Sequence, residues 1–391
     1  MPCPSPRDMQ SDIHLIGSGQ TRFGELWDKG IRDLMEEATD AAINSSPCTA
    51  LDIDMVIVSN MLAEVTNGQA HLAAIASSLL PHHPPAIRVE SACGSGAFAL
   101  HTACAMLESG RARNVLVIGV EKMTDVSVDT VASALMGAAD SEQERPAGLT
   151  FPGIFGLITQ RYMHEYGLTR DELSLVSAVH HRNACENPFA QFRLPVTPDA
   201  VTKSAMVSNP LRLLDCSPIS DGAAACILST EHAGAARLVA SQIASDSLSI
   251  VDRPTITSFS ATKDAAERAL AEAEITLKDV RILETHDCFS TAALINLEDL
   301  GFCDPGEAIG IYHNLWRGGS PLDGARGRLP ALGVNLSGGL KGCGHPVAAT
   351  GIKQLIDVSK QLQKTGDRYG LAHNFGGAAA TCGIHILESI S

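Results

Sequence analysis

The chain has 391 residues, of which 45% are hydrophobic and 19% are charged, and its formal net charge is −15. At roughly 150 residues per domain, this length predicts two or three domains with a core large enough to need no disulfide or metal support. An acidic surface repels phosphate backbones, which argues against a nucleic-acid-binding protein.

The N-terminal residues and the cysteines bear on the compartment. The segment MPCPSPRDMQ lacks a charged region followed by an apolar core, so we expect no secretory signal. No apolar run is long enough to span a bilayer, which excludes an integral membrane protein. The eleven cysteines are scattered and form no C-x-x-C pair. We therefore expect reduced thiols, no zinc or other metal site, and a cytoplasmic protein.

Short apolar runs alternate with helical periodicity along most of the chain, which predicts an α/β fold with buried sheets. The predicted strands cover residues 14–19, 54–59, 114–120, 224–229, 237–244, 281–284 and 381–387. The clearest predicted helices cover residues 30–43, 94–107, 263–273 and 350–363.

Two segments depart from this alternation. Residues 127–209 are rich in polar and turn residues, with helical pieces at 160–166 and 170–183, and we interpret them as an insertion over one face of the sheet. Residues 310–332 contain five Gly and two Pro and are predicted to form a loop. Residues 87–93 and 282–288 each lead from a strand to a cysteine before a helix of small residues, which suggests a duplicated α/β core.

Cys93 lies at the predicted start of a helix and is flanked by Gly94 and Gly96. Unpaired N–H groups and the positive end of the helix dipole would stabilise a thiolate there. The glycines would let another backbone or a thioester approach closely. The alternative is a packed core cysteine, which is our interpretation of Cys104 in the middle of the same helix.

Three further segments carry candidate chemistry. Residues 335–351 form a glycine-rich loop with one imidazole, His345, and a thiol nucleophile near neutral pH needs such a base; the alternative is a turn residue. His286, Asp287 and Cys288 place three titratable groups after a strand, with metal ligation as the alternative. Residues 372–378 are mostly small and could direct backbone N–H groups at an oxyanion, or form a tight turn.

Taken together and in this order, these motifs resemble the thiolase superfamily over essentially the whole chain, and most specifically the sterol-carrier-protein-type thiolases. The matching segments are ESAC at 90–93, GVEKMT at 119–124, SPISDGAA at 217–224, HDCF at 286–289 and GGLKGCGHP at 338–346.

The resemblance implies two βαβαβαββ halves in a five-layer αβαβα sandwich with an inserted loop domain. On this basis residues 1–126 and 210–233 form the N-terminal half, residues 127–209 form the inserted, coenzyme A-binding loop domain, and residues 234–391 form the C-terminal half. It also implies a homodimer or a dimer of dimers, and we expect no separate lipid-transfer domain after Ser391.

The resemblance also implies roles for individual residues. Cys93 would take the acyl group from a coenzyme A thioester, and His345 would be its base. His286, with His345, would hold the thioester oxygen of the second substrate. The N–H groups of Cys93 and Gly376 would form the oxyanion hole.

This chain also departs from the common thiolases. They carry Asn-Glu-Ala-Phe where this chain has His286-Asp-Cys-Phe289, and a Cys-x-Gly turn where it has Asn374-Phe-Gly376. Sterol-carrier-type members draw the second, acid/base cysteine from the His-Asp-Cys-Phe loop, so Cys288 is the candidate. Ala348 replaces a glycine found in many relatives, a change that would alter the shape of the pocket.

The implied function is a thiolase-type acyltransferase of lipid metabolism that makes or cleaves 3-ketoacyl-CoA by Claisen condensation or thiolysis. Coenzyme A thioesters would be substrates, with no permanently bound cofactor. The candidate phosphate-binding residues are Arg182 and Arg212, with Arg193 and Lys203 beside them. One alternative is a C-acyltransferase with a non-CoA acceptor, which could require a small OB-fold partner. Another is an aldolase-type lyase on the same fold.

Overall fold

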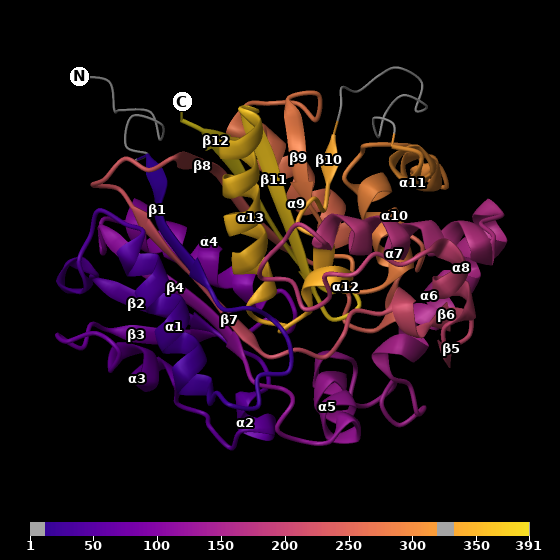
Figure 1. The fold of residues 1–391 in the computed structure, drawn as a ribbon, viewed down its shortest axis with the longest axis horizontal. Coiled ribbons are helices and arrows are strands. Elements are labelled where there is room, and N and C mark those ends of the chain that lie inside the picture. Colours follow the sequence, from indigo (N-terminus) through magenta and orange to yellow (C-terminus); the bar gives the residue numbers. More distant parts are fainter. Residues whose placement is uncertain (1–11, 319–331, 391) are drawn as a thin grey trace.

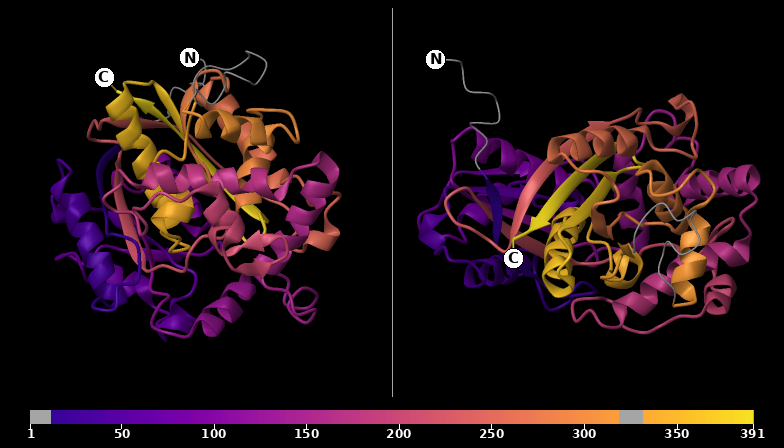
Figure 2. Two further views of the ribbon diagram at one scale, coloured as in Figure 1. Left: turned by 45° about the vertical axis from the view of Figure 1, so that its right-hand side comes forward. Right: turned by 90° about the horizontal axis from the view of Figure 1, so that it is seen from above.

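A computed structural model describes residues 12–318 and 332–390. It contains two α/β halves side by side, with a largely helical insertion packed along one flank of both (Figures 1 and 2). The strands of the N-terminal half are β1 (Ile13–Gln20), β2 (Met55–Ser59), β3 (Ala86–Val89), β4 (Asn114–Glu121) and β7 (Gly222–Ser229). Its helices are α1 (Ile31–Asn44), α2 (Ala63–Thr66), α3 (Leu72–Ser77) and α4 (Ser95–Glu108).

The C-terminal half repeats this order of elements. Its strands are β8 (Ala236–Ser245), β9 (Val280–Glu284), β10 (Gly333–Val334), β11 (Tyr369–Gly376) and β12 (Thr381–Ser389). Its helices are α9 (Ser260–Ala273), α10 (Ser290–Asp299), α11 (Ala308–Trp316), α12 (Gly339–Cys343) and α13 (Thr350–Thr365).

The two halves have the same sheet topology. The strand order is β3-β2-β4-β7-β1 in the first half and β10-β9-β11-β12-β8 in the second. In each half the three strands farthest from the junction are parallel to one another. The remaining pairings, β4–β7 and β7–β1 in the first half and β11–β12 and β12–β8 in the second, are antiparallel. A short antiparallel pairing of β1 with β8 joins the two sheets at their edges. The duplication expected from the two strand-to-cysteine segments is therefore present in the structure.

The core is divided into layers by the two sheets. Helices α1 and α3 cover the outer face of the first sheet, and α9 and α10 pack on the outer side of the second. Helices α4 and α13 contact each other and strands of both halves, so they form the central layer. This arrangement is the predicted five-layer sandwich. Strands β4 and β7 are buried at every position because helices cover both of their faces.

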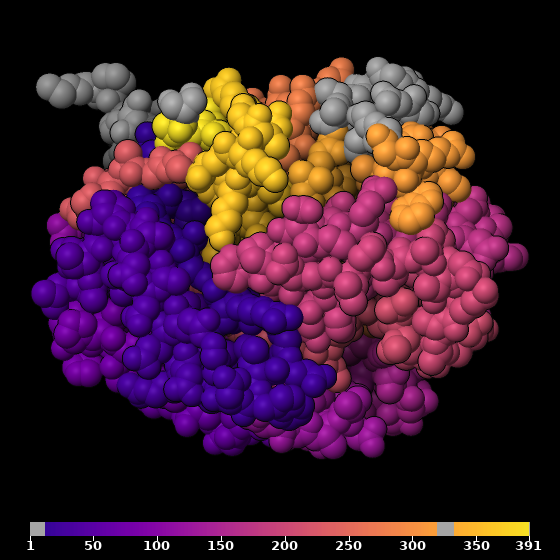
Figure 3. All heavy atoms as spheres, in the orientation of Figure 1, coloured from indigo at the N-terminus to yellow at the C-terminus, as the bar shows by residue number. Residues whose placement is uncertain are grey.

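The insertion consists of α5 (Val128–Leu135), α6 (Phe151–Tyr166), α7 (Arg170–Ala184), α8 (Pro198–Lys203) and the hairpin β5 (Met206–Ser208) and β6 (Leu211–Arg212). It occupies the magenta-to-pink flank in Figure 3. The hairpin crosses the expected boundary at residue 209, since β5 pairs with β6 beyond it. The expected boundary between residues 233 and 234 lies in the turn from β7 to β8.

The seven predicted strands and the four clearest predicted helices all match elements of the structure within a few residues. The loop prediction for residues 310–332 is wrong at its start, because α11 runs to Trp316. Buried Ile311 and Tyr312 give that helix an inward face despite the local glycines. Residues 319–331 of the same prediction lie outside the described residues.

Candidate active site

Cys93 sits on a tight turn between β3 and α4. The preceding residue, Ala92, has a positive φ of 50°, a strained conformation for a residue with a side chain. Ser95 stabilises the turn, because its Oγ accepts the N–H of Ser91 (2.8 Å) and donates to the carbonyl of Ala92 (2.6 Å). Gly94 closes the turn with an N–H bond to the Ser91 carbonyl (2.9 Å). The turn holds the cysteine just ahead of the helix, as the sequence predicts.

The surroundings of Cys93 are apolar. Its half-buried side chain packs against a cluster centred on Leu62, Met123, Val131 and Val347. Burial is the main cause that raises the pKa of the Cys93 thiol to about 12, and the carboxyl group of Glu121 adds to the rise. The expected stabilisation of a thiolate by the helix N-terminus is therefore outweighed by desolvation. Cys93 is therefore a neutral thiol near neutral pH, and a base would have to take its proton before it could act as a nucleophile.

His286 and His345 come together from two loops of the C-terminal half. Their ring centroids are 4.9 Å apart and the rings are nearly perpendicular, at 85°. Burial lowers the pKa of His345 to about 3 and moves that of His286 well below its usual range. Both rings are therefore neutral, and neither Nε2 has a hydrogen-bond partner among the described residues. Two unsatisfied buried nitrogen atoms at one place indicate a site for polar ligand atoms.

The other ring nitrogens indicate different tautomers. Thr350 Oγ1 donates to the carbonyl of Pro346 (3.1 Å), so it accepts Nδ1–H of His345 (2.7 Å) and leaves Nε2 with a free lone pair. Asn374 Nδ2 lies 2.9 Å from Nδ1 of His286 and donates to it, so Nε2 of His286 carries the hydrogen. In this assignment, His345 presents an acceptor and His286 presents a donor.

Cys288 is buried at the start of α10, with 6% of its surface exposed. Burial is the main cause that raises the pKa of its thiol well above the usual value, and the nearby Cys93 sulfur adds to it. The buried ammonium of Lys341 acts in the opposite direction. The structure thus places the two candidate cysteines near enough for the charge of Cys93 to raise the pKa of Cys288. It also places the two candidate histidines ring to ring.

The sequence matches two thiolase family models, "Thiolase, N-terminal domain" over residues 13–232 and "Thiolase C-terminal domain-like" over residues 243–389. The chain belongs to the thiolase family. It is 44% identical to an acetyl-CoA acetyltransferase of Methanocaldococcus jannaschii, over 96% of this chain and 99% of that protein. It is 30% identical to human sterol carrier protein 2, over 93% of this chain and 70% of that protein.

A solved structure described as "Ltp2-ChsH2(DUF35) aldolase" superposes with a TM-score of 0.80 at 22% identity, over 97% of this chain and 98% of that chain. At that identity the likeness shows the fold alone. The family matches and the closely similar acetyltransferase confirm the predicted thiolase resemblance, the thiolase fold and a thiolase-type acyltransferase.

In this thiolase, backbone donors approach Cys93 from the end of β11. A Cβ atom on Gly94 would lie 3.1 Å from the nitrogen of Gly376, so the two turns touch. The next residue, Gly377, directs its backbone N–H at the Cys93 thiol, which acts to lower the pKa of that thiol against the effect of burial. The sequence pointed to the whole run 372–378, and the family resemblance named Gly376 within it but not Gly377.

The predicted coenzyme A contacts are less favoured by the geometry. The Arg182 guanidinium donates to the carbonyls of Leu315 (2.7 Å) and Trp316 (3.2 Å) at the end of α11. Arg212 lies 3.4 Å from the carbonyl of Ser204, and Lys203 pairs with Asp199 at 2.8 Å. These bonds weigh against Arg182 in particular, and phosphate binding by any of these residues stays a prediction.

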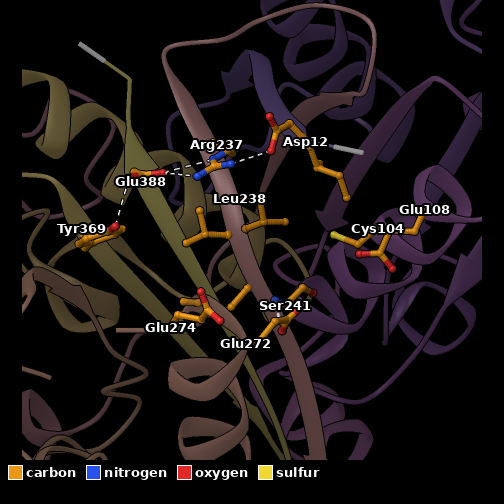
Figure 4. Close-up of a pocket in the computed structure, with 14 residues that line it drawn as sticks. Asp12, Cys104, Glu108, Arg237, Leu238, Ser241, Glu272, Glu274, Tyr369 and Glu388 are labelled. Atoms are coloured by element: carbon orange, nitrogen blue, oxygen red, sulfur yellow. Dashed lines mark hydrogen bonds and ion pairs between the residues drawn. The ribbon is translucent and has the colours of Figure 1, made fainter. Parts of the chain in front are cut away.

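A cavity of about 290 Å³ lies away from this site, between α4, β8 and α9 (Figure 4). Its one cation among the lining residues, Arg237, is paired with Asp12 and Glu388 (both 2.6 Å), and no predicted site residue lines it. In the described part of the chain, no His, Cys, Asp and Glu side chains are grouped to hold a metal ion. No helix in residues 12–318 or 332–390 has the length and apolar character needed to cross a membrane.

Proposed function

We propose that this thiolase makes or cleaves 3-ketoacyl-CoA through an acyl-enzyme on Cys93. The observation that carries the proposal is the pairing of complementary buried nitrogen atoms, an acceptor on His345 and a donor on His286, while Val347, two residues beyond His345, packs in the cluster around Cys93. Forming a carbon–carbon bond next to a thioester needs a nucleophile, a base for the α-proton and a donor for the enolate oxygen.

In the first half-reaction, Nε2 of His345 takes the proton of Cys93 and the thiolate attacks the acyl carbonyl. The N–H groups of Cys93 and Gly376, with that of Gly377, stabilise the oxyanion. The carbon–sulfur bond to coenzyme A breaks, and the departing thiolate takes the proton from His345. The products are acyl-Cys93 and free coenzyme A.

In the second half-reaction, Nε2 of His345 takes the proton of Cys288, and the Cys288 thiolate takes an α-proton from a second acyl-CoA. His286 Nε2–H and the protonated Nε2 of His345 hold the enolate oxygen. The carbanion attacks the acyl carbon, the bond to Cys93 breaks, and the released Cys93 thiolate takes the proton from His345, which leaves Cys288 as a thiol. Thiolysis is the reverse sequence, and ping-pong kinetics follow from the covalent intermediate.

The finer assignments are part of the same proposal. The similar acetyltransferase supports acetyl-CoA as a substrate. The half-exposed edge strand β3 supports a homodimer or a dimer of dimers. A cytoplasmic location is part of the same proposal. The phosphates of coenzyme A would meet the basic residues of the insertion, and the pathway would be one of lipid metabolism.

The deciding experiment is the intact mass of the protein after brief incubation with acetyl-CoA, beside Cys93→Ala. We expect one acetyl adduct on the wild type and none on the variant, followed by formation of acetoacetyl-CoA. No adduct with acetyl-CoA or with longer acyl-CoAs would reject Cys93 as the nucleophile and favour the aldolase-type lyase.

A second candidate is a C-acyltransferase that passes the acyl group to a non-CoA acceptor. The fold neighbour described as an assembly with a DUF35 protein supports a small partner. An acetyl adduct without any acetoacetyl-CoA, and acyl transfer that appears only when such a partner is added, would favour this candidate.

A further inference from the structure

Asp287 lies between His286 and Cys288 in the sequence, yet the steps above give it no role. Its carboxylate is fully buried, with 0% of the residue exposed. Oδ1 accepts the backbone N–H of Leu340 (2.7 Å), and a Cβ atom on Gly339 would lie 2.6 Å from both oxygens. The start of α12, which leads to His345, therefore rests directly on this carboxylate.

A second bond reaches Asp287 from the insertion. Nδ1 of His180 on α7 lies 2.6 Å from Oδ2 of Asp287, and Nε2 of the same ring lies 3.1 Å from the hydroxyl of Tyr312 on α11. Both His180 and Tyr312 are 0% exposed. Nδ1–H donates to the carboxylate, and Nε2 pairs with the tyrosine hydroxyl. This Tyr312–His180–Asp287 chain satisfies both nitrogen atoms of the ring.

The charge of Asp287 is also set by its neighbours. Burial acts to raise the pKa of its carboxyl, but His180 and the buried ammonium of Lys341 outweigh burial and lower that pKa. The ammonium is held in place by the carbonyl of Asp215 (2.5 Å). Asp287 is thus an ionised carboxylate, and its negative charge acts against burial to raise the pKa of His345.

We propose that Asp287 is the positioning carboxylate of the site. It holds the loop bearing His286 and Cys288 against the segment that leads to His345, and its negative charge stabilises the positive form that His345 takes when it accepts the proton of Cys93. His180 and Tyr312 hold Asp287 from the insertion and from α11. This inference rests on the proposed acyl-enzyme mechanism.

The test is Asp287→Asn, which keeps the size of the side chain and removes the charge. Both partners of the carboxylate are N–H donors, so the new amide must turn its own NH₂ toward one of them. We expect the rate of Cys93 acetylation to fall about 100-fold, in kcat rather than KM, as for loss of one preorganised electrostatic group. The negative charge raises the pKa of both His345 and Cys288. Without it, the pH dependence of acetylation and of acetyl-CoA α-hydrogen exchange should move to lower pH.

A matched control is Asp299→Asn, since that buried carboxylate also accepts a backbone N–H, from Phe259 (2.5 Å), and a side-chain donor, Ser258 Oγ (2.8 Å). It should lower the melting temperature without moving either pH profile. Equal loss of rate at every pH in Asp287→Asn, with unshifted profiles, would overturn the proposal and leave a purely structural role. If the wild type forms no acetyl adduct, the proposed function itself fails.

Two milder variants keep the test informative if Asp287→Asn folds poorly. His180→Asn can still donate an N–H close to the position of Nδ1, whereas His180→Leu cannot. We expect His180→Asn to retain most of the acetylation rate that His180→Leu loses. Equal rates in the two variants would contradict the role of the His180–Asp287 bond.

Discussion

The two halves of this thiolase use the same strand-to-helix junction for different purposes. In the first half β3 leads to Cys93 and then α4; in the second β9 leads to Cys288 and then α10. Cys93 follows a residue with positive φ and is partly exposed, whereas Cys288 follows Asp287 and is buried. A duplicated scaffold has therefore placed a thiol at equivalent points of both halves.

The surroundings of the two thiols differ in charge. Near Cys93 the charges are negative, from Glu121 and Glu90, and both raise the pKa of that thiol. Near Cys288, Lys341 lowers the pKa of the thiol while Asp287 raises it. The comparison teaches that the junction supplies the position of a cysteine, and that segments distant in sequence supply its chemistry.

Replacement of the first cysteine should have the largest effect. Cys93→Ala removes the atom that carries the acyl group, so we expect turnover to fall by about four powers of ten or more. The measurement is the steady-state rate of acetoacetyl-CoA thiolysis. Cys104→Ala, on α4 and buried in the core, should retain turnover. Turnover of Cys93→Ala near the wild-type rate would contradict the nucleophile assignment.

Replacement of the second cysteine should separate the two half-reactions. Cys288→Ala leaves Cys93 and His345 in place, so acetylation of Cys93 should continue while condensation falls about 10²- to 10⁴-fold, the range for loss of a general base. Quench-flow mass measurement with acetyl-CoA reports the first step, and acetoacetyl-CoA formation reports the second. Cys303→Ala is the control. An equal loss of rate in acetylation and in condensation would contradict the assignment of the first step to Cys93 and the second to Cys288.

His286 should affect the same step as Cys288 but less strongly. His286→Phe removes the Nε2–H donor for the enolate, so we expect condensation to slow by about 10²- to 10³-fold. Because the donor serves the second substrate, acetylation of Cys93 should change by less than the condensation rate. A variant that loses acetylation to the same extent would place His286 in the first half-reaction.

Much of the fold could be predicted from local sequence, and much of the site could not. Helices cover both faces of β4 and β7, so these strands read as continuous apolar runs and could be predicted from the sequence. Strand β11 contains glycines and has no such run. The motifs located Cys93 and His345. The tautomer of His286 depends on Asn374, which is 88 residues away, and no local pattern pairs these two side chains.

The expected thiolate of Cys93 illustrates the same limit. The helix N-terminus is a local feature that sequence reveals, and it predicts a lowered pKa. The burial that raises the pKa comes from Leu62, Met123, Val131 and Val347, which lie on four separate segments. Local pattern therefore gave the position of Cys93 but the wrong direction for the pKa of its thiol.

Replacement of Glu121 should have the smallest effect, and it tests directly whether nearby charge distinguishes the pKa of Cys93 from that of Cys288. It is fully buried at the end of β4, where burial raises the pKa of its carboxyl to about 8. Its oxygens accept the N–H groups of Met61 (2.6 Å) and Leu62 (3.3 Å), and Leu62 packs in the cluster around Cys93. The carboxyl group thus anchors this cluster and, where it is ionised, adds negative charge near Cys93.

In Glu121→Gln that charge is absent. A carboxylate raises the pKa of a neighbouring thiol because it disfavours the thiolate, so the pKa of Cys93 should fall and its alkylation by iodoacetamide should reach half-maximal rate at lower pH. The difference should be greatest above about pH 8, where Glu121 is ionised in the wild type, and should fade below it, where both side chains are neutral. Glu108→Gln, at the far end of α4, is the control. An unchanged alkylation profile would mean that burial alone distinguishes Cys93, and that the charges around the two thiols do not.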